Sequence, residues 1–537
     1  MKFIFVSGGV ISGLGKGVTT ASIALLLKSR GLKVTPIKCD AYMNVDAGTI
    51  RPQEHGEVFV TKDGVECDQD IGNYERFIDE NLKRSNYVTN GQIYQEIIRR
   101  ERSFGYNGED VEIVPHVPEE MIRRFKQAGK ENKADVVIIE IGGTVGEYQN
   151  ALFIEANRIM KYRDKEDVIH IHVGYLPTPS FLGEMKSKPV QTSVRILAST
   201  GIQPDFIIGR AEKPIDDRRK ERIAWLCNID KENVISNPDA DTIYKVPLIF
   251  KEQKLDEKIL KKLNLKPKKS NLKDWQKLIE NIKRAQKPLS VGIISKYAKV
   301  GDYNLSDAYI SVVEAIKHAA WKEGSKVKII WIDAEGLEKG KEGLKILEGI
   351  KGVIIPGGFG QRGTQGKMAA IKYARENRFP FLGLCFGLQL AVVEFAQNVC
   401  GLSGAHSTEI EPKTKYPVIA YLPEQIKNIK ESNYGATMRL GAYPCIVQKN
   451  TLAHQLYKKS EISERHRHRF EVNPKFHQIL NKNGLIFSGM SPNSKLVEIV
   501  ELKNHPFFVA SQFHPEFQST PKNPHPLFVG FIKACKK

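Results

Sequence analysis

The stretch KFIFVSGGVISGLGKGVTT, residues 2–20, decides the fold of the first half of this 537-residue chain. Its apolar run at 2–8 predicts a buried strand, and residues 16–30 have the pattern of a helix that ends at Gly31. Further β-branched runs at 136–143, 168–175 and 205–210 alternate with helical patterns. The alternation indicates an α/β domain whose doubly wound, mostly parallel sheet binds ligands at the carboxyl ends of its strands.

The loop between the first strand and the first helix has the composition of a phosphate-binding loop. Glycines let the backbone approach phosphate closely, and the N-terminus of a helix favours an anion. Lys16 stands where it would contact the outer phosphates, although a strict P-loop would have glycine in place of Val10 and a hydroxyl residue in place of Gly17. A glycine-rich turn with no ligand is the alternative, but the order strand, loop, lysine, helix favours a nucleotide.

Carboxylates are the expected magnesium ligands, because the position after Lys16 offers no hydroxyl. Asp68 and Asp70 are candidates, and so is Glu140, which lies near the end of a predicted central strand beside two glycines. A solvated acidic residue is the alternative interpretation of each.

The second half repeats the α/β rhythm after a basic, amphipathic segment at 251–288 that predicts connecting helices. β-type runs follow at 289–295, 326–333, 351–358 and 380–387. The sequence therefore predicts two domains, 1–265 and 289–537, joined by a basic linker at 266–288, and the second is also expected to be a doubly wound α/β domain with a mostly parallel sheet.

Cys385 ends an apolar strand directly before a helix, which is the position of an exposed nucleophile on a strand–helix elbow. His514 ends another predicted strand, and Glu516 two residues later can orient its imidazole. The glycine turn 356–360 offers the backbone N–H of Gly358 as an oxyanion donor. Each feature alone is typical of an ordinary core or turn, but together they predict a Cys–His–Glu hydrolytic triad.

Composition excludes several classes of protein. Apolar residues make up 41% of the chain and charged residues 27%, values ordinary for a globular protein, and no apolar run approaches the ~18 residues of a membrane span. The seven cysteines are scattered and include no C-x-x-C pair, so we expect a reducing, cytoplasmic compartment. The net charge of +19 suits nucleic acid, polyanionic nucleotides or a lysine-rich surface equally well.

The first half resembles the P-loop amidoligase domain of the CTP synthase family in SGGVISGLGKG, KCDAYMNVDAGT, EHGEVFV, GNYERF, EIGGTVGE and GEMKSKPVQTSVR. The resemblance implies that ATP binds Gly13, Leu14, Gly15, Lys16, Gly17, Val18, Lys38 and Asp70. It implies Mg²⁺ on Asp70 and Glu140. It also implies that UTP, and CTP as an inhibitor, bind Ser12, Glu147, Tyr148, Gln149, Lys186, Ser187, Lys188, Pro189, Val190, Gln191 and Arg222.

Several of these positions depart from the family pattern. Gln149 and Val190 replace a glutamate and a threonine, and Asp110 with Glu112 adds carboxylates near the expected pyrimidine site. A carboxylate repels a triphosphate, so these changes bear on the uridine-nucleotide contacts more than on ATP.

The second half resembles class I glutamine amidotransferases, whose pattern G-x-C-x-G-x-Q is met at 383–389. The resemblance implies that glutamine contacts Gly358, Phe386, Gly387, Leu388, Gln389, Glu409 and Arg469. Arg362 lies in a segment that resembles the lid through which GTP promotes glutaminase activity.

Together the two resemblances imply ATP-dependent amination of UTP to CTP with ammonia from glutamine, the final step of de novo CTP synthesis. They also imply Mg²⁺ as cofactor, GTP as allosteric activator and a homotetramer, with no nucleic acid or membrane partner. Three alternatives are a cobyrinate-type amidoligase, an ATP-switched DNA-binding protein of the partition type, and a degenerate regulatory paralogue. The KSKPVQ and ERHRHRFE segments argue against the first, and the predicted triad argues against the second.

Overall fold

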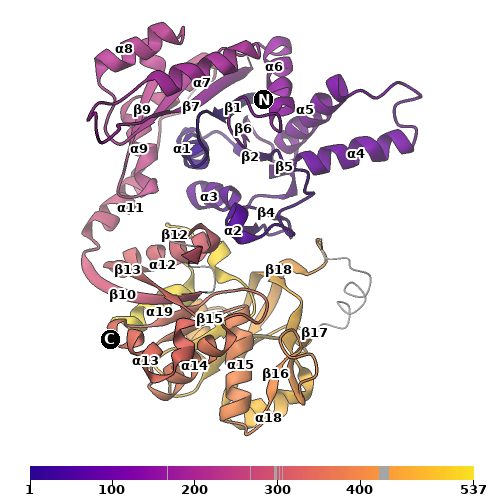
Figure 1. Ribbon diagram of the computed structural model, residues 1–537, viewed down its shortest axis with the longest axis vertical. Helices are drawn as coiled ribbons and strands as arrows, with labels where there is room; N and C mark the ends of the chain where they lie inside the picture. Colours follow the sequence, from indigo (N-terminus) through magenta and orange to yellow (C-terminus); the bar gives the residue numbers. More distant parts are fainter. Residues whose placement is uncertain (166, 267, 296–298, 301–302, 305, 422–434) are drawn as a thin grey trace. The chain divides into compact units, whose positions relative to one another are not determined.

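The computed structural model describes residues 1–165, 167–266, 268–295, 299–300, 303–304, 306–421 and 435–537 (Figure 1). Residue 267, within the predicted linker, lies outside the described residues. The chain forms two compact units, one from residues 1–46 and 70–279 and the other from 47–69 and 280–537. None of the helices in the described ranges combines the length and the apolar composition that crossing a membrane requires.

The first unit is built on a seven-stranded sheet in the order β5-β2-β6-β1-β7-β8-β9, and every neighbouring pair is parallel. Its strands are β1 (Lys2–Gly8), β2 (Val34–Asp40), β5 (Tyr87–Thr89), β6 (Val136–Ile141), β7 (Val168–Leu176), β8 (Phe206–Ala211) and β9 (Val234–Pro238). The central strands are almost wholly buried, as continuous apolar runs covered on both faces must be. The predicted parallel α/β domain is confirmed.

Helices cover this sheet, and their apolar faces complete its core. They are α1 (Lys16–Ser29), α3 (Gln69–Ile78), α4 (Asn90–Arg102), α5 (Ile113–Glu131), α6 (Ala151–Arg163), α7 (Lys188–Ser199), α8 (Asp217–Leu226), α9 (Val246–Glu252), α10 (Leu255–Lys262) and α11 (Lys273–Arg284), whose end passes into the second unit. Helices α4, α5 and α6 share one apolar cluster with β1 and β6, whereas α1 packs on β1, β2 and β6 beside α9 and α10. Figure 1 shows α4 and α5 extending together away from the sheet.

The second unit contains a nine-stranded mixed sheet in the order β13-β10-β14-β15-β23-β22-β21-β18-β19. Its strands are β10 (Lys287–Ser295), β13 (Ser325–Asp333), β14 (Val353–Ile355), β15 (Phe381–Leu384), β18 (Arg439–Val447), β19 (Glu461–His468), β21 (Leu485–Met490), β22 (Val497–Leu502) and β23 (Phe508–Ser511). The α/β class is confirmed, and the strands from β13 to β23 pair in parallel. The other half, from β22 to β19, is antiparallel, which the predicted alternation did not include.

Two layers of helices enclose the second sheet. Helices α14 (Thr364–Glu376) and α15 (Phe386–Asn398) share one core cluster, while α12 (Ile310–Lys322) and α19 (Pro526–Cys535) share the other. The smaller elements are β11 (Lys299–Val300), β12 (Tyr303–Asn304), α13 (Lys341–Leu344), β16 (Ala405–Ser407), β17 (Tyr416–Tyr421), α17 (Leu452–Tyr457), β20 (Phe470–Val472) and α18 (His477–Lys482).

Segment 47–69 belongs to the second unit, although the sequence prediction placed it within the domain 1–265. It contains α2 (Pro52–His55) and the hairpin of β3 (Val58–Val60) and β4 (Glu66–Asp68). Glu57 accepts hydrogen bonds from the backbone N–H of Ser311, at 3.2 Å to each carboxylate oxygen, and from its hydroxyl. Because Ser311 lies in the first turn of α12, the Glu57 carboxylate caps that helix, a contact typically worth about 1 kcal/mol.

Candidate functional site

The carboxyl edge of the first sheet carries the glycine-rich loop. Residues 9–15 join β1 to α1, and Gly13 and Gly15 adopt φ of +73° and +83°. This left-handed region is open to glycine without strain. The backbone therefore turns sharply over the sheet edge and presents the N-terminus of α1, where an anion is favoured. The predicted strand–loop–helix arrangement is present in the structure.

Lys16 is buried at the first position of α1 and donates a hydrogen bond of 2.5 Å to the carbonyl oxygen of Gly143. Burial lowers the pKa of Lys16, while the nearby carboxylate of Glu140 acts in the opposite direction. A Cβ on Gly8 would lie 2.8 Å from Lys16 Cδ, so the absence of a side chain there leaves the path for the lysine stem. Gly8 therefore leaves the space that the Lys16 stem occupies beside the end of β1.

Lys38, Asp70 and Glu140 converge on one another, as their assignment to a single site requires. The parallel register pairs Lys38 on β2 with Glu140 on β6, and Lys38 Nζ lies 3.1 Å from Glu140 Oε1. Lys38 also forms an ion pair with Asp70 at the start of α3. The other oxygen of Glu140 accepts a hydrogen bond from the hydroxyl of Tyr74, a residue whose role the sequence analysis missed.

Asp68, the third carboxylate considered, belongs to the second unit and pairs with His55 at 3.2 Å. Asp70 instead lies against the loop helix, since a Cβ on Gly17 would fall 2.0 Å from Asp70 Oδ1. Within the first unit, two carboxylates and two lysines therefore surround the start of α1. This donor set suits a hard divalent cation bound together with phosphates.

The residues assigned to a uridine nucleotide lie on four segments of the first unit, one of which is the glycine-rich loop itself. Ser12 and residues 147–149 are exposed, and the Tyr148 side chain is 97% exposed. Residues 186–191 form the start of α7 with the loop before it, and Arg222 is exposed on α8. Val190 is fully buried against β7, because a Cβ on Gly174 would lie 2.8 Å from Val190 Cγ2. The Val190 side chain is therefore part of the core.

Two buried histidines on β7 lie beneath the glycine-rich loop and were not among the predicted site residues. Ser7 Oγ hydrogen-bonds His170 Nε2 at 2.7 Å and His172 Nδ1 at 3.0 Å, and His172 Nε2 bonds Ser193 Oγ on α7 at 2.9 Å. Burial, and then the charge of Lys16, lowers the pKa of His172 to about 3, so the ring is neutral. The signal for them was two polar residues on one face of a buried strand, His-x-His.

Cys385 occupies a strained elbow between β15 and α15 in the second unit. Its φ of +50° with ψ of −97° is unusual for a residue with a side chain. Glycines permit the turn: a Cβ on Gly387 would lie 2.3 Å from the carbonyl oxygen of Ile355, and one on Gly383 would lie 2.9 Å from the backbone of Gly387. The G-x-C-x-G spacing is therefore required by close backbone packing around the sulfur-bearing residue.

His514 and Glu516 form the predicted dyad. His514 Nδ1 lies 2.7 Å from Glu516 Oε1, and the ring stacks on Phe517 at 5.0 Å. Burial alone would lower the pKa of His514, but the Glu516 carboxylate and the Cys385 sulfur outweigh burial and raise the pKa to about 10. The imidazole is therefore protonated at neutral pH, with the Glu516 carboxylate against Nδ1 and the Cys385 sulfur also beside the ring.

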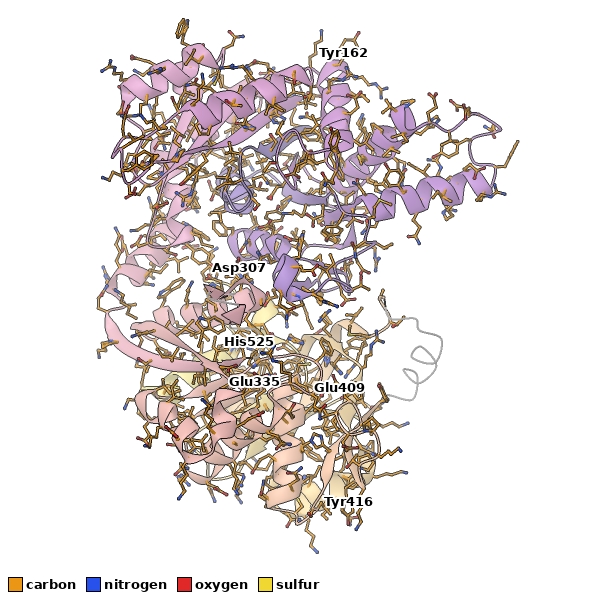
Figure 2. All side chains as sticks on the ribbon, viewed as in Figure 1. Tyr162, Asp307, Glu335, Glu409, Tyr416 and His525 are labelled. Atoms are coloured by element: carbon orange, nitrogen blue, oxygen red, sulfur yellow. The ribbon has the colours of Figure 1, made fainter. Side chains whose placement is uncertain are left out.

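Cys385, His514 and Glu516 line one cavity of about 580 Å³ in the second unit. Gly358, Glu409 and Arg469 line the same cavity, so it brings together six residues that the sequence analysis selected. Glu409, labelled in Figure 2, accepts a 2.6 Å hydrogen bond from the backbone N–H of Gly360. A carboxylate and a guanidinium in one cavity fit a zwitterionic amino acid.

Other predicted residues lie close to this cavity without lining it. Phe386, Gly387, Leu388 and Gln389 form the first turn of α15 and are buried. Arg362 is mostly exposed and forms an ion pair of 2.5 Å with Glu335, which Figure 2 also labels. The cavity is therefore lined by Cys385, His514 and Glu516, whereas the first turn of α15 is buried beside Cys385.

Segment 47–69 forms part of the wall of this cavity, with residues 48–52, Glu57 and Val58. Arg467 attaches the segment to β19, because its Nε donates 2.8 Å to Glu66 Oε1. Arg465 is fully buried and donates 2.9 Å to the carbonyl oxygen of Val60. The two arginines thus have partners within the unit, and the sequence alone did not identify those partners.

Comparisons with known proteins show which family the chain belongs to. A family model described as CTP synthase N-terminus matches residues 2–265, and one described as Glutamine amidotransferase class-I matches residues 304–534. Proteins named CTP synthase from Caldanaerobacter subterraneus subsp. tengcongensis and Methanocaldococcus jannaschii are each 50% identical to this chain, over 99% of its length and 98% of theirs. A solved structure described as the glutaminase domain of Trypanosoma brucei CTPS with bound acivicin is 36% identical, covers 46% of this chain and 94% of its own, and gives a TM-score of 0.42.

Proposed function

This chain belongs to the CTP synthase family of glutamine-hydrolysing ligases, and from that membership we propose how its residues share the conversion of UTP, ATP and glutamine to CTP, ADP, phosphate and glutamate. The observation that carries the proposal is the shared cavity of Cys385, His514 and Glu516 in a chain whose other unit has a lysine-bearing glycine loop. One unit releases nitrogen from glutamine, and the other activates the pyrimidine that receives it.

The first unit holds ATP on residues 13–18, with Lys16 and Lys38 near the phosphates. The 4-oxygen of uracil is a poor leaving group, so transfer of the terminal phosphoryl group to it precedes displacement by ammonia. Such a transfer depends chiefly on alignment and on neutralising charge. The support is the burial of both lysines at the sheet edge beside Glu140 and Asp70.

Asp70 and Glu140 would hold Mg²⁺, which supplies charge neutralisation across the phosphates when it is bound. The fit rests on two carboxylates that both reach Lys38 Nζ. In the structure, Lys38 satisfies both carboxylates, and Tyr74 fixes the second oxygen of Glu140. Lys38 and Tyr74 thereby keep the acidic pair oriented toward the start of α1.

UTP would contact Ser12, residues 147–149, residues 186–191 and Arg222, and CTP would compete for the same region. The triphosphate carries about four negative charges, which suits Lys186, Lys188 and Arg222. Because the Val190 side chain lies in the core, only the backbone of this residue can contact the nucleotide.

The proposal has three further parts, which rest on family membership. GTP activates the enzyme through the segment around Arg362, the chain assembles as a homotetramer, and the protein is cytoplasmic.

Glutamine hydrolysis follows from the cavity in the second unit. The Cys385 thiolate attacks the side-chain amide carbon of glutamine while Glu409 and Arg469 hold its amino and carboxylate groups. The backbone N–H of Gly358 stabilises the oxyanion, and His514 gives its proton to the nitrogen as the C–N bond breaks and ammonia leaves. Water then hydrolyses the thioester with His514 as base, which releases glutamate and restores the thiolate.

The direct test measures CTP formed from UTP, ATP and Mg²⁺, with either glutamine or ammonium chloride as the nitrogen source. The proposal expects CTP and ADP in equal amounts from both sources, with one glutamate per CTP in the glutamine reaction. Glutamate release without CTP, or no CTP from either source, would contradict it.

Glu516→Gln should lower glutamine-dependent kcat by about 10²-fold. The Glu516 carboxylate raises the pKa of His514, so the neutral amide lets that pKa fall and the imidazolium deprotonates at lower pH. The alkaline limb of the pH–rate profile for glutamine hydrolysis should therefore move to lower pH, whereas the wild-type imidazolium persists toward pH of about 10. An unchanged alkaline limb would show that Glu516 does not set the charge of His514.

Gly17→Ala should slow CTP formation from both nitrogen sources by roughly 10–100-fold and raise the Mg²⁺ concentration needed for half-maximal rate. The new Cβ would fall 2.0 Å from Asp70 Oδ1 and push that carboxylate away from the start of α1. Gly349→Ala is the control, because a Cβ there meets nothing within 4 Å. A Gly17→Ala enzyme with normal Mg²⁺ dependence would remove Asp70 from the metal assignment.

A further inference from the structure

Two buried glutamines lie behind the nucleophile in the second unit. Gln389 is on α15, and Gln512 directly follows β23. Their side chains are 3% and 0% exposed, and neither lines the cavity. Buried amides of this kind need hydrogen-bond partners, and their partners determine which way each amide points.

A chain of contacts fixes the orientation of both amides. The backbone carbonyl of Phe470 can only accept, so the end of Gln389 that lies 3.2 Å from it is the amide nitrogen. The same nitrogen lies 3.5 Å from Gln512 Oε1. The oxygen of Gln512 therefore faces Gln389, and its own nitrogen faces the other way, 3.7 Å from Cys385 Sγ.

Among the residues that the structure describes, the Cys385 sulfur also lies 3.8 Å from the backbone carbonyl oxygen of Arg467 and interacts with the imidazole of His514. A backbone carbonyl oxygen can only accept a hydrogen bond, which a thiol can donate and a thiolate cannot. The amide nitrogen of Gln512 does the opposite, because an N–H donor stabilises negative charge on sulfur. Of these two contacts, the amide nitrogen of Gln512 is therefore the one that suits the nucleophilic form of the sulfur.

We propose that Gln512 is a catalytic residue of the glutaminase site that donates a side-chain hydrogen bond to the Cys385 thiolate, and that Gln389 is a positioning residue that holds the Gln512 amide in this orientation. The inference deepens the proposed function and rests on it, since the thiolate is the nucleophile of glutamine hydrolysis. It also assigns a role to Gln389, the glutamine of the G-x-C-x-G-x-Q pattern, which is to orient the Gln512 side chain.

The test measures thiolate formation on the full-length protein, independently of turnover. Iodoacetamide forms a carbon–sulfur bond with the thiolate and releases iodide, and mass spectrometry of the Cys385 peptide separates this site from the other six cysteines. The pH midpoint of Cys385 alkylation should rise by about one unit in Gln512→Met, which is equivalent to a tenfold smaller thiolate fraction below the midpoint. Gln512→Glu should raise it further, because a carboxylate would face the sulfur.

The matched variants separate a specific contact from general damage. Gln389→Met should shift the midpoint in the same direction by a smaller amount. Gln397→Met, on the same helix with its amide 2.7 Å from the carbonyl oxygen of Ala405, should leave it unchanged. Gln397→Met should also keep CTP synthesis from both nitrogen sources. Gln512→Met should lose about tenfold in glutamine kcat/KM with little change in its thermal unfolding midpoint.

Equal midpoints in wild type, Gln512→Met and Gln512→Glu would overturn the proposal, as would a shift of the same size in Gln397→Met. If Gln512→Met fails to fold, the smaller shift in Gln389→Met decides the question, and its absence counts against the proposal. A wild-type protein that shows the expected shifts but releases no ammonia from glutamine would refute the proposed function and leave the hydrogen bond standing.

Discussion

Cys385→Ala should abolish CTP formation from glutamine, with a loss of 10³-fold or more, and leave formation from ammonia within about twofold of wild type. The thiolate is the only group in the proposed mechanism that attacks glutamine. The residues proposed to bind phosphate, by contrast, belong to the other unit. Parallel assays with glutamine and with ammonium chloride measure both rates on the same preparation.

Cys400→Ala is the matched control for the loss of a thiol. Cys400 is half-buried in the same unit, and its sulfur lies 3.9 Å from the carbonyl oxygen of Ile479, outside the cavity. It should retain both activities. If Cys385→Ala reduced the ammonia reaction as severely as the glutamine reaction, the division of labour between the two units would be wrong.

The elements that form both sites were predictable because they depend on local patterns. A β-branched run followed by glycines and a helix specifies its own geometry, whether it ends at Lys16 or at Cys385. The meeting of Lys38 with Glu140 also follows from simple rules, since parallel strands bring their carboxyl ends to one edge. The strand positions and the contact of His514 with Glu516 therefore needed no long-range information.

The position of segment 47–69 could not be predicted from local sequence patterns. Sequence order places it between two parts of the first unit, yet it packs with the second through pairs such as Glu66 with Arg467, which are 401 positions apart. The order of residues along the chain does not predict which distant residues form such a pair. The antiparallel strands β18, β19, β21 and β22 present the same difficulty, because their pairing depends on which edge of the sheet remains open.

The partners of individual buried polar residues were also not predictable from the sequence. The hydroxyl of Tyr74 and the buried rings of His170 and His172 support the first site through partners on other strands and helices. Polar residues inside an apolar strand signal that such partners exist, since a buried polar group must be satisfied. Such residues do not indicate which distant residue is the hydrogen-bond partner. Val190 shows the reverse case, since a residue assigned to a binding motif by resemblance has its side chain in the core.

Lys16→Ala should remove CTP formation from both nitrogen sources, by 10³-fold or more, while glutamine hydrolysis by the second unit persists at a basal rate. Lys16 is the first residue of α1, and its ammonium lies beside Gly143 and near Glu140 and Asp70. Without it, the charge that develops on the transferring phosphoryl group is not neutralised, and two carboxylates face the phosphates with one cation fewer. ATP-dependent release of ADP, followed with ammonia as the nitrogen source, measures the loss directly.

Lys28→Ala on the same helix is the control, because its ammonium forms an ion pair with Glu80 at the opposite end of α1 from the glycine loop. It should keep both reactions. Loss of a buried cation can also destabilise a fold, so the thermal unfolding of Lys16→Ala and of Lys16→Met, which keeps the length of the stem, should be measured beside wild type. If either variant is folded and still makes CTP from ammonia at a substantial rate, the glycine-rich loop is not the phosphate site. If both variants are folded and inactive while Lys28→Ala is active, the ammonium of Lys16 itself, and not the packing of its stem, supports phosphoryl transfer.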